Sequence, residues 1–132
     1  MRILVADDFD DTREVMRLLL EQRGHEVIEA GNGREAVQRA LAEKPDFVLM
    51  DLNMPVMDGF DAVRCIRQDD QTACIPIVAL SAHTLDKHWR ARAIACGCDE
   101  YYMKPLDFED LDSLLRVPET AGAARCRARC SQ

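Results

Sequence analysis

Residues 46–51 read Asp-Phe-Val-Leu-Met-Asp, and residues 76–81 read Pro-Ile-Val-Ala-Leu-Ser. Each stretch is a short, nearly continuous apolar run that ends in a polar residue. Such runs are typical of strands that are buried on both faces of a parallel sheet. Three further runs rich in strand-forming residues complete a set of five expected strands: 2–6, 26–30 and 100–103.

Amphipathic stretches alternate with these runs. Apolar residues recur at helical spacing in the first of them, at Val15, Met16, Leu19 and Leu20. Asp10 or Asp11 is the expected cap of this helix at 11–23, and Gly24 stands where a helix commonly ends. The other expected helices are 33–42, 59–67, 85–96 and 108–115. Five strands that alternate with five helices predict an α/β fold, a doubly wound (βα)5 parallel sheet with right-handed crossovers.

Length and composition restrict the class of protein. A chain of 132 residues forms one domain, and 17 Lys+Arg against 24 Asp+Glu give a net charge of −7. Segment 119–132 carries Arg125, Arg127 and Arg129 against Glu119, so the acidic excess lies in the rest of the chain. This balance argues against direct nucleic-acid binding, which favours a basic face.

The sequence also predicts where the protein works. It holds neither a secretory signal nor an apolar stretch long enough for a membrane span, so we expect a cytoplasmic protein without a membrane partner. Its six cysteines are then expected as reduced thiols. Their spacings, Cys96-x-Cys98 and Cys126-x-x-x-Cys130, do not form a convincing zinc site.

Polar residues stand at the end of four expected strands. Asp7 and Asp8 follow the first, Asp51 ends the third, Ser81 ends the fourth, and Lys104 follows the fifth. Functional residues of an open α/β sheet gather beyond the carboxyl ends of its strands, so we expect these side chains to converge. Three close carboxylates repel one another, and such oxygen ligands suit Mg²⁺. A carboxylate oxygen of such a site can attack phosphorus to form an acyl phosphate, with Lys104 and Ser81 binding the added oxygens.

These residues resemble the receiver domain of two-component response regulators, over about residues 2–116. The matching pieces are Asp7-Asp8, the run Asp-Leu-Asn-Met-Pro-Val-Met-Asp-Gly at 51–59, Leu80-Ser81-Ala82, and Tyr-Tyr-Met-Lys-Pro at 101–105. The resemblance implies a flavodoxin-like sheet of strand order 2-1-3-4-5. It assigns residues 1–118 to the receiver domain and leaves 119–132 as an expected disordered tail, in which Cys126 and Cys130 have no assigned role.

The resemblance also implies a site. Asp51 is then the phosphoacceptor, and Asp8 and Asp51 bind Mg²⁺ through their side chains, with Mn²⁺ as a substitute ion. Asp7 helps to bind the ion, partly through water, and Asn53 offers its backbone carbonyl. Lys104 pairs with the phosphoryl group, and Ser81 closes on it.

Further residues are implied as parts of the switch. Tyr101, three residues before Lys104, matches the rotameric aromatic switch, although successive strand residues point to opposite faces and Tyr102 competes with it. The bond between Lys104 and Pro105 is expected to be cis. His83, two residues after Ser81, is expected to tune the lifetime of the phosphoryl group. Trp89 is either a partner contact or a half-buried core residue.

The implied function is a phosphoacceptor switch of a two-component phosphorelay. A histidine kinase or histidine phosphotransfer protein donates the phosphoryl group, and the loaded Asp51 reshapes a partner-binding face. By resemblance that face consists of the helix at 85–96, the strand at 100–103 and the helix at 108–115. The protein is then no enzyme beyond its own phosphorylation and dephosphorylation. We expect a monomer or a phosphorylation-dependent dimer, and a stand-alone regulator or a receiver segment of a hybrid kinase or multidomain regulator.

Two other classes fit less well. An aspartyl-nucleophile, Mg²⁺-dependent phosphatase of the haloacid-dehalogenase type needs an acid/base Asp two residues after the nucleophile, where this chain has Asn53. A flavodoxin-like FMN carrier needs a phosphate-binding loop rich in Ser, Thr or Gly after the first strand. The sequence there is Asp-Asp-Phe-Asp-Asp at 7–11, which repels phosphate in the absence of a metal.

Overall fold

The computed structural model describes residues 1–54, 56–81, 87–104 and 106–117. Five strands form one sheet: β1 (Arg2–Ala6), β2 (Glu26–Ala30), β3 (Phe47–Asp51), β4 (Ile77–Ser81) and β5 (Glu100–Met103). All neighbouring strands are parallel, and their order across the sheet is β2-β1-β3-β4-β5. The predicted doubly wound fold and its strand order are therefore confirmed.

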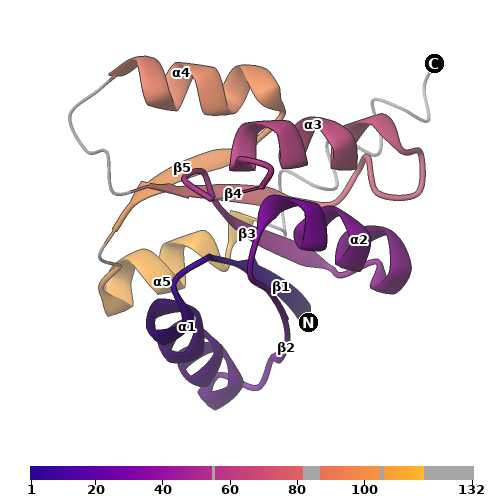
Figure 1. Ribbon diagram of the computed structural model, residues 1–132. Coiled ribbons are helices and arrows are strands. Elements are labelled where there is room, and N and C mark those ends of the chain that lie inside the picture. The colour runs from indigo at the N-terminus through magenta and orange to yellow at the C-terminus, as the bar shows by residue number, and fades with distance from the viewer. Residues whose placement is uncertain (55, 82–86, 105, 118–132) are drawn as a thin grey trace.

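Helices cover both faces of the sheet (Figure 1). They are α1 (Asp10–Gln22), α2 (Gly33–Glu43), α3 (Gly59–Gln68), α4 (Lys87–Cys96) and α5 (Phe108–Leu114). Apolar residues of α2, α3 and α4 pack against one face of the sheet, and those of α1 and α5 pack against the other. The sheet thus separates two apolar clusters, and its central strands contribute to both of them.

The central strands explain the continuous apolar runs of the sequence. Every residue of β3 and β4 is buried, because helices cover both faces of these strands. Their last residues, Asp51 and Ser81, are buried as well, although both are polar. A buried polar group needs a partner, so the burial of these two residues already marks this end of the sheet.

The ends of α1 agree only in part with the prediction. Gly24 has φ of 88° and follows the last residues of the helix, as its position in the sequence indicates. The expected cap by Asp10 or Asp11 is wrong, because Phe9 occupies the cap position and no side chain caps the helix. Both aspartates lie in the first turn instead, where negative charge is favourable near the helix N-terminus.

Two apolar residues of the expected helical stripes lie at the surface. Val15 of α1 is 55% exposed and Phe108 of α5 is 67% exposed. The two helices pack on the sheet through other residues, namely Met16, Leu20, Leu111 and Leu114. The apolar face of each helix is therefore wider than the part that packs on the sheet. The remainder leaves apolar surface between α1 and α5.

Arg67, near the end of α3, links three segments of the chain. Its side chain is only 12% exposed. The guanidinium donates hydrogen bonds to the carbonyl oxygens of Ala73 (2.9 Å), Ile75 and Gly97 (2.9 Å). It also donates to Asp99 Oδ2 at 3.0 Å, and that oxygen accepts a second bond from the amide of Ile77 at 2.8 Å. The side chain thus holds α3, the segment before β4 and the turn before β5 together.

Two further observations concern membrane-spanning helices and the state of the cysteines. Within the part of the chain that the structure describes, no helix is both long and apolar enough to cross a membrane. The cysteines of that part are free thiols, with Cys96 and Cys98 buried and Cys65 and Cys74 partly exposed. Cys126 and Cys130, like the whole predicted tail at 119–132, lie outside the described residues.

Candidate functional site

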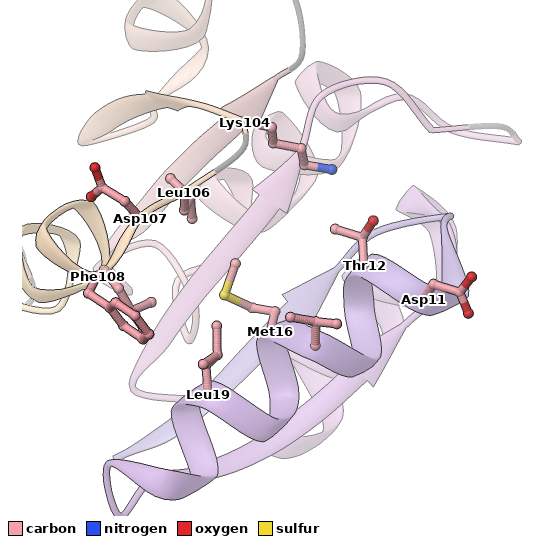
Figure 2. A pocket seen from close by; sticks show the side chains of 10 residues that line it. Asp11, Thr12, Met16, Leu19, Lys104, Leu106, Asp107 and Phe108 are labelled. Atoms are coloured by element: carbon pink, nitrogen blue, oxygen red, sulfur yellow. The ribbon is translucent and has the colours of Figure 1, made fainter.

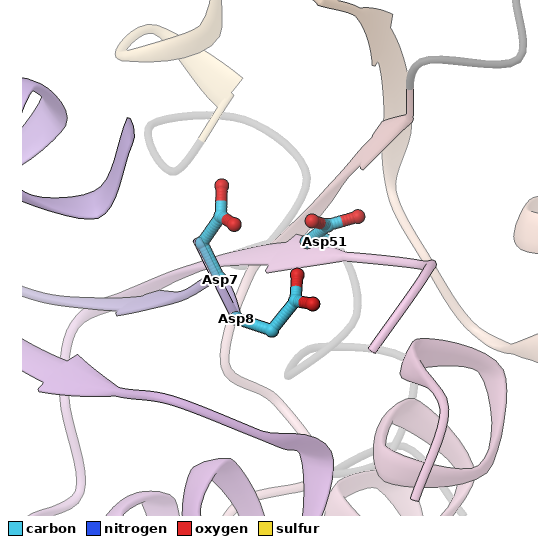
Figure 3. A group of neighbouring side chains, drawn as sticks. All are labelled: Asp7, Asp8 and Asp51. Carbon is cyan, nitrogen blue, oxygen red and sulfur yellow. The ribbon is translucent and has the colours of Figure 1, made fainter. Parts of the chain in front are cut away.

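Three carboxylates meet beyond the carboxyl ends of β1 and β3 (Figure 3). Asp7 and Asp8 directly follow β1, and Asp51 is the last residue of β3. One oxygen atom of each residue lies within 4.8 Å of the others. Asp7 and Asp51 are buried, whereas Asp8 is exposed at the mouth of the cluster. The convergence follows from topology, because parallel strands present their carboxyl ends at the same edge.

Lys104 joins this cluster from the residue after β5. Its Nζ donates to Asp7 Oδ2 at 2.6 Å and to Asp51 Oδ2 at 3.0 Å. The other oxygen of each carboxylate accepts from a backbone amide, Asp7 from Phe9 and Asp51 from Asn53, both at 2.9 Å. The charge-assisted bonds with Lys104 orient the two buried carboxylates.

Burial and neighbouring groups shift the pKa values of Asp51 and Lys104. Burial raises the pKa of Asp51, and the nearby Asp7 charge adds to this effect, although the Asn53 amide and Lys104 oppose it. Burial alone lowers the pKa of Lys104, but its hydrogen bonds and ion pairs with Asp7 and Asp51 outweigh that and raise it. The Lys104 ammonium is therefore held in its charged form, and the Asp51 carboxyl group ionises less readily than an exposed aspartate.

The remaining charge of the site fits a divalent cation. The cluster sets three carboxyl groups against one ammonium, and all of its possible metal-ligand atoms are oxygens. A hard cation such as Mg²⁺ prefers this donor chemistry and retains several waters. The cluster lines a hollow of about 300 Å³ together with Phe9, Thr12 and Asn53, which offers room for the hydrated ion.

Ser81 lies at the same edge of the sheet, at the end of β4. In the pairing of β3 with β4, Asp51 lies opposite Leu80, so Ser81 stands one residue further along. The carbonyl oxygen of Ser81 accepts from the Lys104 amide at 2.9 Å, which joins the ends of β4 and β5. The three strand ends that carry Asp51, Ser81 and Lys104 are thus neighbours in space.

The two adjacent tyrosines of β5 lie on opposite faces of the sheet. Tyr101 is half-buried against the cluster formed by α2, α3 and α4, which also includes Trp89. Tyr102 packs against the cluster formed by α1 and α5. Trp89 itself is half-buried, with its ring 5.3 Å from that of Phe60. Tyr101 is therefore the tyrosine on the side of α4, and Trp89 packs on the core. His83 and Pro105 lie outside the described residues.

A second cavity adjoins the carboxylate cluster, between α1 and α5 (Figure 2). It has a volume of about 720 Å³ and is lined mainly by apolar side chains, with Val15 and Phe108 among them. Thr12 and Lys104 line this groove as well as the carboxylate hollow, so the two lie next to each other. The groove was not predicted from the sequence, although the wide apolar stripes of the two helices were a signal for it.

The fold and the site together place the chain in a known class. The family model of the response regulator receiver domain matches residues 3–116, and the chain belongs to this family. It is thus a signalling domain, the receiver of a response regulator in a two-component system.

Individual relatives support the same assignment. The chain is similar to protein PilH of Pseudomonas aeruginosa, with 39% identity over 112 residues, which are 83% of this chain and 90% of that protein. Its structure is similar to that of the chemotaxis protein CheY4 of Vibrio cholerae, with a TM-score of 0.82, 33% identity, and coverage of 88% and 97%. It is also similar to the receiver domain of a sensor histidine kinase from P. aeruginosa, with a TM-score of 0.82, 31% identity, and coverage of 90% and 98%. That structure carries a magnesium ion in its active-site cleft.

Proposed function

We propose that this chain is a phosphoacceptor switch, in which Asp51 takes a phosphoryl group from a histidine kinase or a histidine phosphotransfer protein. One observation carries the proposal. A buried carboxylate at the edge of the sheet stands beside two further carboxylates and accepts a hydrogen bond from Lys104 at 3.0 Å. Buried, cation-paired carboxylates in a hollow are typical of functional sites.

Asp8 and Asp51 would hold Mg²⁺ through their side chains, Asp7 would help, partly through water, and Asn53 would add its backbone carbonyl; Mn²⁺ suits the same ligands. The magnesium ion in the related kinase receiver supports this assignment. When bound, the ion neutralises carboxylate charge and polarises phosphoryl oxygens.

The protein's own groups account for the rest of the transfer. An oxygen of Asp51 attacks phosphorus, an O–P bond forms, and the P–N bond to the donor histidine breaks. Lys104 then binds an oxygen of the transferred group in place of the carboxylate oxygen, and its raised pKa keeps it charged for this role. Ser81, at the end of the adjacent strand, supplies a hydroxyl to the same group.

The loaded site biases an equilibrium between two arrangements of the protein. Movement of Ser81 towards the phosphoryl group opens space for Tyr101, which lies on the side of α4. The face formed by α4, β5 and α5 would then bind the downstream protein, or a second copy of the chain.

The groove between α1 and α5 is the surface on which we expect the phosphodonor protein to dock. The donor must bring its phosphohistidine to Asp51, and the groove adjoins the carboxylate hollow at Thr12 and Lys104. Its exposed apolar residues, Val15 and Phe108, suit an apolar face of a partner helix.

The proposal extends to the cellular compartment of this switch and to the kind of protein that contains it. Residues 1–118 form the receiver, which acts in the cytoplasm without direct contact with nucleic acid or membrane. It is a stand-alone regulator or, alternatively, a segment of a hybrid kinase or multidomain regulator, and it catalyses only its own phosphorylation and dephosphorylation.

Intact-mass spectrometry after incubation with phosphoramidate and Mg²⁺ tests the proposal. We expect the mass of one phosphoryl group to be added to the protein, and the addition to disappear on removal of Mg²⁺ or in Asp51→Asn. Asp10→Asn is a matched control, because Asp10 is an exposed carboxylate near the hollow that pairs with Arg13. An adduct that survives in Asp51→Asn would refute the assignment, and turnover of a phosphomonoester would indicate a phosphatase instead.

A further inference from the structure

Gly33, the first residue of α2, lies directly against the loop that follows β3. A Cβ atom at this position would stand 2.0 Å from the carbonyl oxygen of Met57, 2.8 Å from its carbonyl carbon and 3.1 Å from the oxygen of Asp58. All three are backbone atoms, which cannot move aside as the end of a flexible side chain can. Any side chain at position 33 must therefore displace the loop or the start of α2.

The same loop is held closely at its other end. Gly59 begins α3, and a Cβ atom there would lie 2.4 Å from the carbonyl oxygen of Asp51 and 2.6 Å from the Cα of Leu52. Its amide donates to the Leu52 oxygen at 3.2 Å. The loop thus leaves β3 at Asp51, meets the start of α2 at Gly33, and returns against Asp51 and Leu52 at Gly59, where α3 starts.

Val56 stands between these contacts and the proposed metal ligands. It has φ of 70°, a conformation that is unusual for a β-branched residue, and the residue is 77% exposed. Exposure means that packing of its own side chain does not stabilise this conformation. Strained backbone persists where its surroundings over-determine it, and the backbone contact at Gly33 is such a constraint.

We propose that Gly33 is a positioning residue for the Mg²⁺ site, acting through the loop on Asn53 and Asp51. The amide of Asn53 donates to Asp51 Oδ1, so a shift of the loop changes the orientation of the carboxylate as well as the place of the Asn53 carbonyl. Val56 transmits the shift, because a β-branched residue has fewer accessible backbone conformations than glycine and absorbs less of a displacement. This inference rests on the proposed function, since it concerns the same metal site.

Replacement of Gly33 by alanine tests the inference, with Mg²⁺ affinity measured by calorimetry and amide shifts measured by NMR without metal. We expect Mg²⁺ to bind about tenfold more weakly, as is typical when a residue that supports metal ligands is changed. We also expect the Asn53 and Asp51 amide signals to shift. Gly31→Ala is the matched control, because a Cβ at Gly31 meets only the ends of flexible side chains, at 3.4 Å or more.

Two further variants keep the outcome decisive. In Gly33→Ala/Val56→Gly, the added glycine absorbs the displacement, so Mg²⁺ affinity recovers at least partly. If Gly33→Ala fails to fold, Val56→Gly alone must bind Mg²⁺ more weakly than the wild type, because its loop is less well ordered. A folded Gly33→Ala with unchanged affinity and unchanged Asn53 signals overturns the positioning role, as does unchanged or tighter binding by Val56→Gly. A wild-type protein that binds no Mg²⁺ refutes the proposed function, whereas the amide shifts in metal-free protein still report on Gly33.

Discussion

Arg67→Met is the change that most directly tests how the fold is held together beneath the site. The variant retains an unbranched apolar stem of similar length but removes every hydrogen bond of the guanidinium. Asp99, whose side chain is 5% exposed, then loses its ion pair with the guanidinium. Loss of one partner of a buried ion pair costs about 3–5 kcal/mol. We expect about 4 kcal/mol, the middle of this range, with the carbonyl oxygens that lose their donor included in the cost.

Urea unfolding, followed by circular dichroism and by the fluorescence of Trp89, measures this loss. With a slope of about 2 kcal/mol per molar urea, the midpoint should fall by about 2 M. Arg64→Met is a matched control on the same helix, because Arg64 pairs at 3.1 Å with Asp61 and both side chains are more than half exposed. Exposed pairs contribute at most about 1 kcal/mol. Equal midpoints for the two variants would refute the reasoning.

Two more variants separate charge from geometry. Arg67→Lys restores the positive charge without the planar fork that reaches both the carbonyls and Asp99, so most of the loss should remain. Adding Asp99→Asn to Arg67→Met should recover part of the stability, because the carboxylate that the guanidinium neutralised is then replaced by a neutral amide. An additive double variant would show that the two residues do not act as a pair.

Further predictions concern the loop, the groove and the phosphoacceptor. Val56→Gly should change the free energy of unfolding by less than about 1 kcal/mol, because relief of strain at positive φ is offset by the flexibility that glycine adds to the loop; a larger change in urea unfolding would contradict this. Val15→Glu should slow phosphotransfer from a phosphorylated kinase while leaving the rate with phosphoramidate unchanged, and equal slowing with both donors would exclude the groove as the docking surface. Burial raises the pKa of Asp51, so the folded protein binds this proton more tightly than the unfolded chain does, and the ionised form destabilises the fold. Asp51→Asn should therefore raise the unfolding free energy at pH 7 without Mg²⁺, and the gain should shrink as the pH falls through the raised pKa; a gain that grows would contradict the sign.

The fold could be predicted from short-range sequence patterns, because the residues of each strand or helix show its hydrophobic periodicity by themselves. The buried runs that end in Asp51 and Ser81 are continuous, since helices cover both faces of the central strands. The N-terminal cap of α1 was harder to predict. Asp10 and Asp11 have the right chemistry for a cap, yet the helix begins one residue earlier than expected and places both within its first turn.

The candidate site could likewise be predicted only in part. That Asp7, Asp8, Asp51 and Lys104 meet at one edge follows from their places at strand ends. The details of the meeting do not follow from those places. Lys104 bonds both buried carboxylates while Asp8 remains exposed, and this depends on side-chain reach and on the depth of each residue in the hollow.

By itself, the sequence determined the alternation of strands and helices and the residues at each strand end, because periodicity and turn chemistry are local properties. Only the tertiary structure decided that Tyr101 lies on the side of α4, that Val15 borders an open groove, and that Gly33 meets the backbone of Met57. Each of these depends on how segments far apart in the chain pack against one another. Residue spacing within a segment encodes which face is apolar, but the neighbour that covers the face is set by the assembled sheet and its helices.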